Sequence, residues 1–217
     1  MVDRAGRDDD VTVPAGSARL EGHLSLPADG RGVVVFAHGS GSSRHSPRNR
    51  YVAAELNQSG RCTLLVDLLT SEEEADRAKV FDVALLARRL LDVTRWLRDR
   101  PDTRGQPVGY FGASTGAGAA LWAAAEPDAH VAAVVSRGGR PDLAAPRLAL
   151  VHAPTLLIVG GRDDAVLDLN RAAQVQLRAP SRLEIVPGAT HLFEEPGAIE
   201  RVAQLASDWF ATHLVDG

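Results

Sequence analysis

Cysteine is nearly absent from this sequence, which has Cys62 as its only example in 217 residues. A single cysteine excludes a disulfide framework and fits the reducing conditions of the cytoplasm. No apolar run approaches the roughly 20 residues that a membrane span requires. Residues 1–10 lack the apolar core of a signal peptide, and we expect them to form a flexible tail. The sequence therefore predicts a cytoplasmic protein that is not inserted in a membrane.

An excess of positive charge is also missing. The chain has 24 basic and 28 acidic residues and a formal net charge of −4, which argues against nucleic acid as a partner. The histidines at His23, His130, His152 and His213 stand without the close spacing of a metal-ligand set. We therefore expect neither a metal ion nor a cofactor, and the sequence leaves the oligomeric state open.

Apolar segments rich in β-branched residues alternate with helical segments along most of the chain. Strands are expected at about 32–37, 62–67, 107–112, 130–136, 155–160 and 182–187, and the clearest helices at about 80–99 and 197–213. The alternating polarity of 19–26 indicates a half-exposed edge strand that pairs with 11–13 in antiparallel fashion. This order predicts one α/β domain over 11–217, with a mostly parallel sheet of about eight strands and helices on both faces. Residues 137–154 are too few for a cap domain.

A candidate nucleophile, Ser114, lies in the stretch from Gly112 to Gly116, directly after the apolar run 107–111. This stretch has the Gly-x-Ser-x-Gly pattern of a nucleophile elbow, in which a strand turns sharply into a helix with the serine at the apex. The two glycines let strand and helix approach without a Cβ clash. The alanine-rich residues 117–125 form helices readily, so the context that the pattern needs is present.

An acid and a histidine follow Ser114 in the chain order Ser, Asp, His that α/β-hydrolases require. Asp163 or Asp164 lies in the turn after a buried apolar strand, and His191 lies in the loop after the last strand. A Gly-x-x-Asp-x-x-Val register from Gly160 favours Asp163 as the acid, whereas Asp164 competes from the next position. Each residue alone has an ordinary interpretation as part of a turn, but their joint order at strand ends predicts a Ser-His-Asp triad.

The segment His38-Gly39-Ser40 follows the apolar strand 32–37. A serine hydrolase needs two backbone N–H donors for the tetrahedral oxyanion, each worth about 2.7–4 kcal/mol. The amide of Thr115, directly after the elbow serine, is one candidate donor, and the amide of Ser40 is the other. His38 is expected to hold this loop through hydrogen bonds of its ring, and direct binding of substrate is the alternative.

Arginines also lie on two loops at this edge of the expected sheet. Arg44 and Arg48 follow the oxyanion loop, while Arg137 and Arg140 follow the strand after the elbow. Because ligands bind at the carboxyl ends of parallel strands, Arg137 or Arg140 is a candidate for gripping an anionic group of the substrate. The alternative is a solvated rim in which the arginines pair with the acidic run 72–76.

Residues 17–215 resemble an α/β-hydrolase, and among these the small, minimally capped dienelactone hydrolase-like group. The resemblance is carried by the oxyanion loop, the elbow around Ser114, the acid Asp163 and the base His191. It implies a cofactor-independent hydrolase without a substantial cap domain. Dienelactone hydrolases proper carry cysteine at the elbow, where this chain has Ser114, and Cys62 is expected to be a small buried residue. A general carboxylic ester is therefore the expected substrate rather than a lactone.

We thus expect a serine hydrolase that cleaves esters of small carboxylic acids through an acyl-enzyme on Ser114. An acyltransferase, a thioesterase or a perhydrolase would use the same three side chains, because the pocket and not the triad selects the acyl acceptor. A binding module that keeps the fold without catalysis is the alternative from another class. Reaction of the serine with a fluorophosphonate distinguishes the enzymes from such a module.

Overall fold

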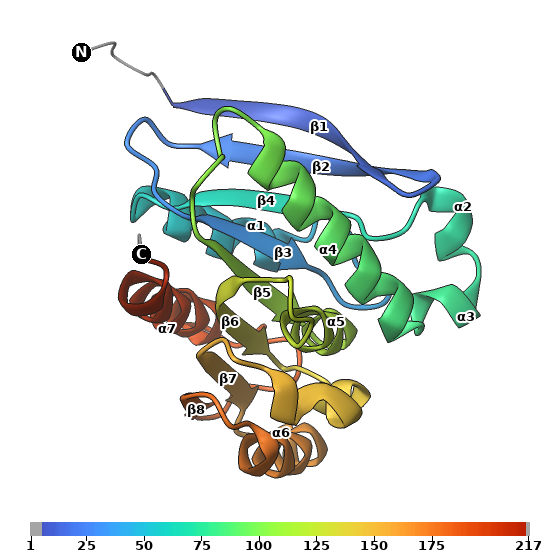
Figure 1. Ribbon diagram of the computed structural model, residues 1–217. Coiled ribbons are helices and arrows are strands. Elements are labelled where there is room, and N and C mark those ends of the chain that lie inside the picture. Colours follow the sequence, from blue (N-terminus) through green and yellow to red (C-terminus); the bar gives the residue numbers. More distant parts are fainter. Residues whose placement is uncertain (1–5, 216–217) are drawn as a thin grey trace.

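The computed structural model describes residues 6–215, which surround one central sheet (Figure 1). The strands are β1 Arg7–Ala15, β2 Ala18–Leu26, β3 Val33–Ala37, β4 Cys62–Val66, β5 Val108–Ala113, β6 Val131–Arg137, β7 Thr155–Gly160 and β8 Ser181–Val186. The helices are α1 Pro47–Gln58, α2 Ser71–Glu74, α3 Arg77–Val80, α4 Val83–Asp99, α5 Thr115–Ala124, α6 Asp164–Gln176 and α7 Ala198–His213, together with the 3₁₀ helix η1 Pro141–Leu150. The spatial order of the strands is β1-β2-β4-β3-β5-β6-β7-β8. This is the α/β architecture that the sequence predicts.

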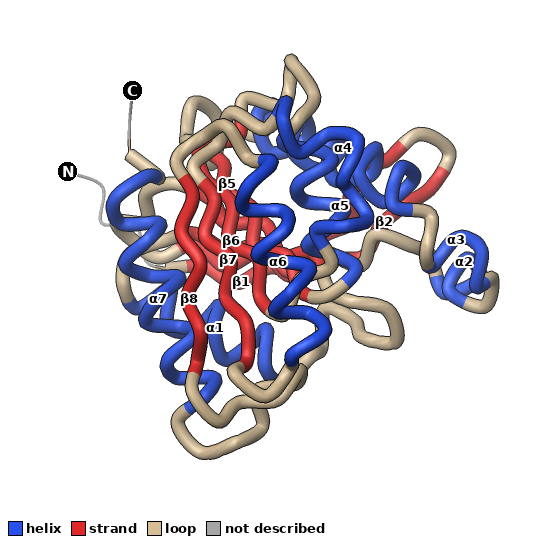
Figure 2. Tube along the Cα trace, turned by 90° about the horizontal axis from the view of Figure 1, so that it is seen from below, coloured by secondary structure: helices blue, strands red, loops and turns tan. Residues whose placement is uncertain are grey.

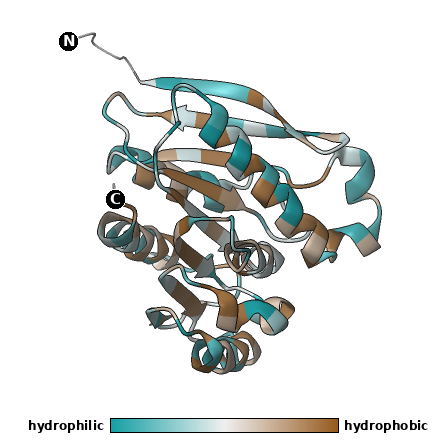
Figure 3. Ribbon diagram, viewed as in Figure 1, coloured by the Kyte–Doolittle hydropathy of each residue, from teal (hydrophilic) through white to brown (hydrophobic). Residues whose placement is uncertain are grey.

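The sheet is mostly parallel with an antiparallel edge. β2 runs antiparallel to both of its neighbours, β1 and β4. Every pair from β4 across to β8 is parallel. β3, β4, β5 and β7 are buried along their whole length, as continuous apolar strands between two helical layers must be. Figure 3 shows the contrast between these brown central strands and the largely hydrophilic β1.

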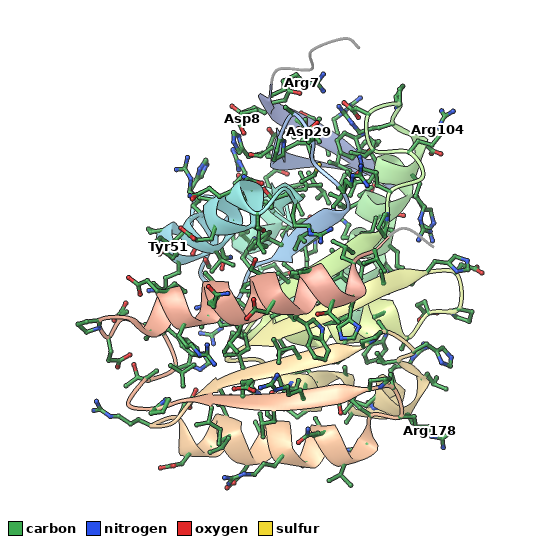
Figure 4. All side chains as sticks on the ribbon, turned by 90° about the vertical axis from the view of Figure 1, so that its left-hand side faces the viewer. Arg7, Asp8, Asp29, Tyr51, Arg104 and Arg178 are labelled. Carbon is green, nitrogen blue, oxygen red and sulfur yellow. The ribbon has the colours of Figure 1, made fainter. Side chains whose placement is uncertain are left out.

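The start of β1 corrects one expectation from the sequence. Residues 7–10, part of the predicted flexible tail 1–10, instead pair with the end of β2. The hydrophilic sequence of this segment was misleading because an edge strand is held by backbone hydrogen bonds and does not need apolar side chains on both faces. The side chains of Arg7 and Asp8 lie at the outer margin of the molecule (Figure 4). Residues 1–5 of the predicted tail lie outside the described residues.

The helices form two layers, one on each face of the sheet (Figures 1 and 2). α1 and α7 pack together on one face, while α4, α5, η1 and α6 cover the other. Successive side chains of β3 point to opposite faces of the sheet and so contribute to both cores. Val33 and Val35 belong to the core beneath α4 and α5, and Val34 and Phe36 belong to the core beneath α1 and α7. The sheet therefore has a complete hydrophobic layer on each side.

α4 begins later than the sequence pattern indicates. The expected helix of 80–99 starts at Val83, because the Asp82 side chain accepts a hydrogen bond from the Leu85 amide at 2.9 Å and caps the helix there. Between β6 and β7, the described chain holds only η1 and no cap domain. None of the helices in residues 6–215 has the length and apolar character needed to cross a membrane.

Candidate active site

Ser114 lies at the turn from β5 into α5, with φ 49° and ψ −121°. A positive φ is uncommon for a residue with a side chain and marks local strain. The flanking positions have no room for a side chain, so both must be glycine. A Cβ on Gly112 would lie 2.4 Å from the Ala117 Cα, and one on Gly116 would lie 2.1 Å from the Ala37 carbonyl oxygen. The turn therefore holds the Ser114 side chain at the carboxyl edge of the sheet.

Asp163 and His191 come from the loops after β7 and β8. The Nδ1 of His191 is hydrogen-bonded to Oδ2 of Asp163 at 2.6 Å. Because a carboxylate only accepts, Nδ1 carries the proton and Nε2 is left to accept one. Of the two aspartates that compete in the sequence, Asp163 is the one that contacts the histidine. Asp164 is instead the exposed first residue of α6.

Contacts between the two loops hold this pair in place. A Cβ on Gly160 would lie 2.5 Å from the Ala189 carbonyl oxygen, so the end of β7 packs directly against the histidine loop. The Arg162 amide donates to the same carbonyl at 2.9 Å. The Glu195 carboxylate accepts from the Thr190 amide at 3.1 Å, and hydrogen bonds from the side chain and the amide of Thr190 lower the pKa of Glu195. Sequence reasoning gave Glu195 no role, because no pattern of spacing marks such a contact.

A cavity of about 940 Å³ opens beside Ser114. The predicted site residues on its wall are His38, Ser40, Ser114, Thr115, Arg137 and His191. Apolar side chains, among them Leu68, Leu69, Val80 and Leu86, complete the wall. Asp163 reaches the site through His191, whereas Arg140 is not part of the wall. The fold thus brings together every predicted site residue except Arg140.

The loop after β3 lies against Ser114. A Cβ on Gly39 would approach the Cβ of Ser114 to 3.0 Å, so only glycine lets this backbone come so close. Outside the helices and strands of residues 6–215, no backbone–backbone hydrogen bond uses the amide of Ser40 or of Thr115. Both amides are therefore available as donors to a group bound beside Ser114.

Asp67 is a residue of this site that the sequence analysis did not single out. It directly follows β4, and its carboxylate accepts from the Arg44 amide at 2.5 Å, pairs with the Arg44 guanidinium and lies 3.3 Å from Nε2 of His38. Burial raises the pKa of Asp67, but the contact with His38 and the hydrogen bonds from Arg44 outweigh this effect and lower it overall. Arg44 therefore pairs with Asp67 and not with the acidic run 72–76. Asp67 directly follows a strand, at the edge of the sheet where ligands bind, and this position in the sequence could have identified it.

The two candidate arginines have different surroundings. Arg140 binds both carboxylate oxygens of Asp142, at 2.8 and 2.7 Å, outside the cavity. Arg137 is only 8% exposed and donates to the Asn49 side-chain oxygen at 3.4 Å, while its Nε has no hydrogen-bond partner in the described chain. No carboxylate among residues 6–215 pairs with Arg137. Burial and the charge of Arg48 lower the pKa of Arg137 to about 10, so the guanidinium stays charged at neutral pH.

Comparison with known proteins identifies relatives over nearly the whole chain. Residues 20–214 match the model of the dienelactone hydrolase family. A Mycobacterium tuberculosis H37Rv protein with the provisional name of a phosphoribosyl transferase is 65% identical over 208 residues, which is 96% of this chain and 47% of that protein. The chain thus spans about half the length of the curated relatives it matches.

Solved structures agree with this match. The crystal structure of a dienelactone hydrolase from Anabaena variabilis ATCC 29413 is 57% identical with a TM-score of 0.93, over 97% of this chain and 99% of that one. Est1E from Butyrivibrio proteoclasticus shares the fold, with a TM-score of 0.78 at 15% identity over 94% of this chain and 98% of its own.

Proposed function

We propose that this chain, which belongs to the dienelactone hydrolase family, cleaves esters of small carboxylic acids with Ser114 as the nucleophile. Membership of the family implies hydrolase activity, and the proposal adds the residues and the bond that is cleaved. The observation that carries it is the 2.6 Å hydrogen bond between His191 and Asp163, next to a serine on a strained elbow in the same cavity. We propose the cytoplasm as its location, which the single, buried Cys62 suits.

The proposed reaction begins when Oγ of Ser114 attacks the ester carbonyl carbon and Nε2 of His191 takes the hydroxyl proton. The Asp163 carboxylate holds the opposite ring nitrogen and stabilises the imidazolium that forms. The carbonyl electrons move to oxygen, where the amides of Ser40 and Thr115 donate hydrogen bonds to the negative charge. Collapse expels the alcohol, which takes the proton from the imidazolium, and leaves the acyl group on the serine.

Water then completes the cycle by the same path. His191 takes a proton from water, the oxygen attacks the acyl carbon, and Ser114 leaves with the proton as the acid is released. Water has access because no cap domain covers the cavity in the described chain. An acyltransferase, a thioesterase or a perhydrolase would use the same groups with another acyl donor or acceptor, and analysis of the products separates these activities.

A negatively charged group on the substrate is the second part of the proposal. Buried charges in proteins are normally paired, because leaving water is costly. Arg137 lines the cavity with its guanidinium buried and hydrogen-bonded only to the neutral Asn49. A carboxylate on the bound ester would supply the missing partner with charge-assisted hydrogen bonds. Arg140, which already binds Asp142, is left out of this proposal.

The test of the nucleophile combines turnover of 4-nitrophenyl acetate with labelling by a fluorophosphonate. Ser114→Ala should lose the label and lower kcat by about 10⁴-fold or more while keeping the thermal unfolding midpoint, because alanine fits the elbow. Ser17→Ala, an exposed serine in the turn between β1 and β2, is the matched control and should behave as wild type. Turnover near the wild-type rate in Ser114→Ala would refute the proposed function, and so would a wild type that does not label.

A further inference from the structure

Three charged side chains meet beside the oxyanion loop without taking part in the proposed chemistry. His38 follows β3 and Asp67 follows β4, while Arg44 lies towards the far end of the loop that connects β3 to α1. Asp67 holds both ends of this loop, because its carboxylate contacts the His38 ring at one end and the Arg44 amide at the other. The His38 and Asp67 side chains are only 13% and 10% exposed, so water screens their interaction poorly.

The surroundings of His38 favour a proton on both ring nitrogens. Nδ1 lies 2.9 Å from the Gly39 carbonyl oxygen, and the buried Nε2 lies 3.3 Å from Oδ1 of Asp67, as an ion pair outside good hydrogen-bond angles. A neutral imidazole has one N–H, so either tautomer would set a nitrogen lone pair against an oxygen. The imidazolium donates a hydrogen bond from Nδ1 to Gly39 and places a positive charge beside the Asp67 carboxylate.

The electrostatics of the cluster agree with this geometry. Burial by itself lowers the pKa of His38, but the contacts with Asp67 and with the Gly39 carbonyl outweigh it, so the pKa is raised overall. The carboxylate of Glu74, on the cavity wall, adds a smaller attraction. The remaining charged neighbour, Arg44, is paired with Asp67. The charged pair is therefore complete below about pH 6.5, the ordinary histidine value, and is lost as pH rises through the raised pKa of His38.

The peptide bond between Gly39 and Ser40 links the His38 hydrogen bond to the proposed oxyanion site. The Gly39 carbonyl and the Ser40 amide belong to one planar peptide unit, in which C=O and N–H point in opposite directions. Holding the Gly39 oxygen on the His38 ring therefore fixes where the Ser40 N–H points. This peptide lies against the nucleophile, since a Cβ on Gly39 would come within 3.0 Å of the Cβ of Ser114.

We propose that the His38 imidazolium and the Asp67 carboxylate are positioning residues that aim the Ser40 amide at the oxyanion, so that loss of the His38 proton slows the reaction. The inference rests on the proposed function, because the oxyanion forms only when Ser114 attacks an acyl carbon. An oxyanion exists in the transition state and not in the bound ester. Losing this alignment therefore lowers kcat and kcat/KM equally and leaves KM unchanged.

The experiment measures kcat and KM for 4-nitrophenyl acetate across the pH range in which the protein stays folded. The inference predicts that kcat falls at high pH, as the His38 proton is lost, and two variants assign this fall to His38. In Asp67→Asn the fall should move to lower pH by about 1–3 units, because the nearby negative charge is gone. In His38→Asn the side-chain amide replaces Nδ1 as a donor to Gly39 and does not titrate. The fall should then disappear, with kcat about tenfold or more below wild type at its optimum.

The matched control is His23→Asn, which removes another histidine–aspartate contact (3.0 Å, to Asp10) that is not part of the cavity wall and should leave the profile unchanged. An NMR titration of the His38 ring in the wild type tests the inference without turnover and without variants. A His38 pKa at or below 6.5, the ordinary value, overturns it. So does a wild-type profile without a fall at high pH, or an Asp67→Asn profile that matches wild type.

Fluorophosphonate labelling separates this inference from the proposed function. If wild type labels and turns over ester but the two variants keep its pH profile, the positioning role is refuted and the serine hydrolase stands. If wild type neither labels nor turns over ester, the proposed function itself is refuted.

Discussion

Asp163 and Asp164 are neighbours in the sequence, but the structure gives them different surroundings. Asp163 accepts a hydrogen bond from Nδ1 of His191 at 2.6 Å, whereas Asp164 is exposed at the start of α6. We expect Asp163→Asn to lower kcat by about 10⁴-fold, because an amide in that place stabilises the wrong tautomer of His191. Asp164→Asn is the control and should stay near wild type. Steady-state kinetics on one small ester compare the two, and a larger loss in Asp164→Asn would contradict the assignment.

Arg137 is the residue whose surroundings most restrict the substrate. If its buried guanidinium binds a substrate anion, wild type should prefer an ester with a free carboxylate over a neutral ester of equal size. A charged hydrogen bond worth about 1.5–3 kcal/mol corresponds to a preference of roughly ten- to a hundredfold in kcat/KM.

Arg137→Gln should abolish that preference and leave the rate on the neutral ester little changed. Arg140→Gln, which removes an arginine that is bound to Asp142 outside the cavity, should keep it. Matched pairs of esters, assayed with all three proteins, decide the question. Equal kcat/KM for acidic and neutral esters in wild type would show that Arg137 binds no substrate anion.

At the scale of elements, the site depends on how closely β5, α5 and β3 approach one another. Gly116 is the second residue of α5, and a Cβ there would lie 2.1 Å from the Ala37 carbonyl oxygen at the end of β3. We expect Gly116→Ala to lower the free energy of unfolding by about 1–3 kcal/mol, because the helix must move away from the strand. The same shift should lower kcat, since the elbow and the oxyanion loop separate.

Gly6→Ala is the matched control for this substitution. A Cβ on Gly6 meets no atom closer than 3.6 Å, so the added methyl group fits without movement. Urea unfolding of both variants measures the difference. A Gly116→Ala protein as stable as Gly6→Ala would show that the approach of α5 to β3 is not tight.

At the scale of the whole molecule, the cavity is bordered by loops and the short helices α2 and α3, with no cap domain in the described chain. A lipase-like activation at an oil surface requires a cover that opens there, so we expect none. The rate on a short-chain triglyceride should follow the dissolved concentration and level off at the solubility limit. A sharp rise in rate when droplets form would contradict this prediction, and a soluble 4-nitrophenyl ester serves as the control substrate.

The sequence by itself determined the features that depend on neighbours along the chain. The eight-stranded, mostly parallel sheet is confirmed, because strand periodicity and the alternation of strands with helices are local patterns. The elbow at Ser114 was readable for the same reason, since its two glycines stand beside it in the sequence. The register from Gly160 pointed to Asp163, the aspartate that contacts His191 in the structure.

Only the tertiary structure decided which distant side chains meet. β4 lies beside β3 in the sheet, and this neighbourhood brings Asp67 to His38. Arg137 and Arg140 look equivalent in the sequence, but Arg137 ends β6 and is buried at the cavity wall, whereas Arg140 lies beyond the strand and binds Asp142. The hydrophilic residues 7–10 form a strand because β2 offers them a backbone partner. The contact of Asp67 with His38 depends on the spatial order of the strands, which no local pattern along the chain encodes.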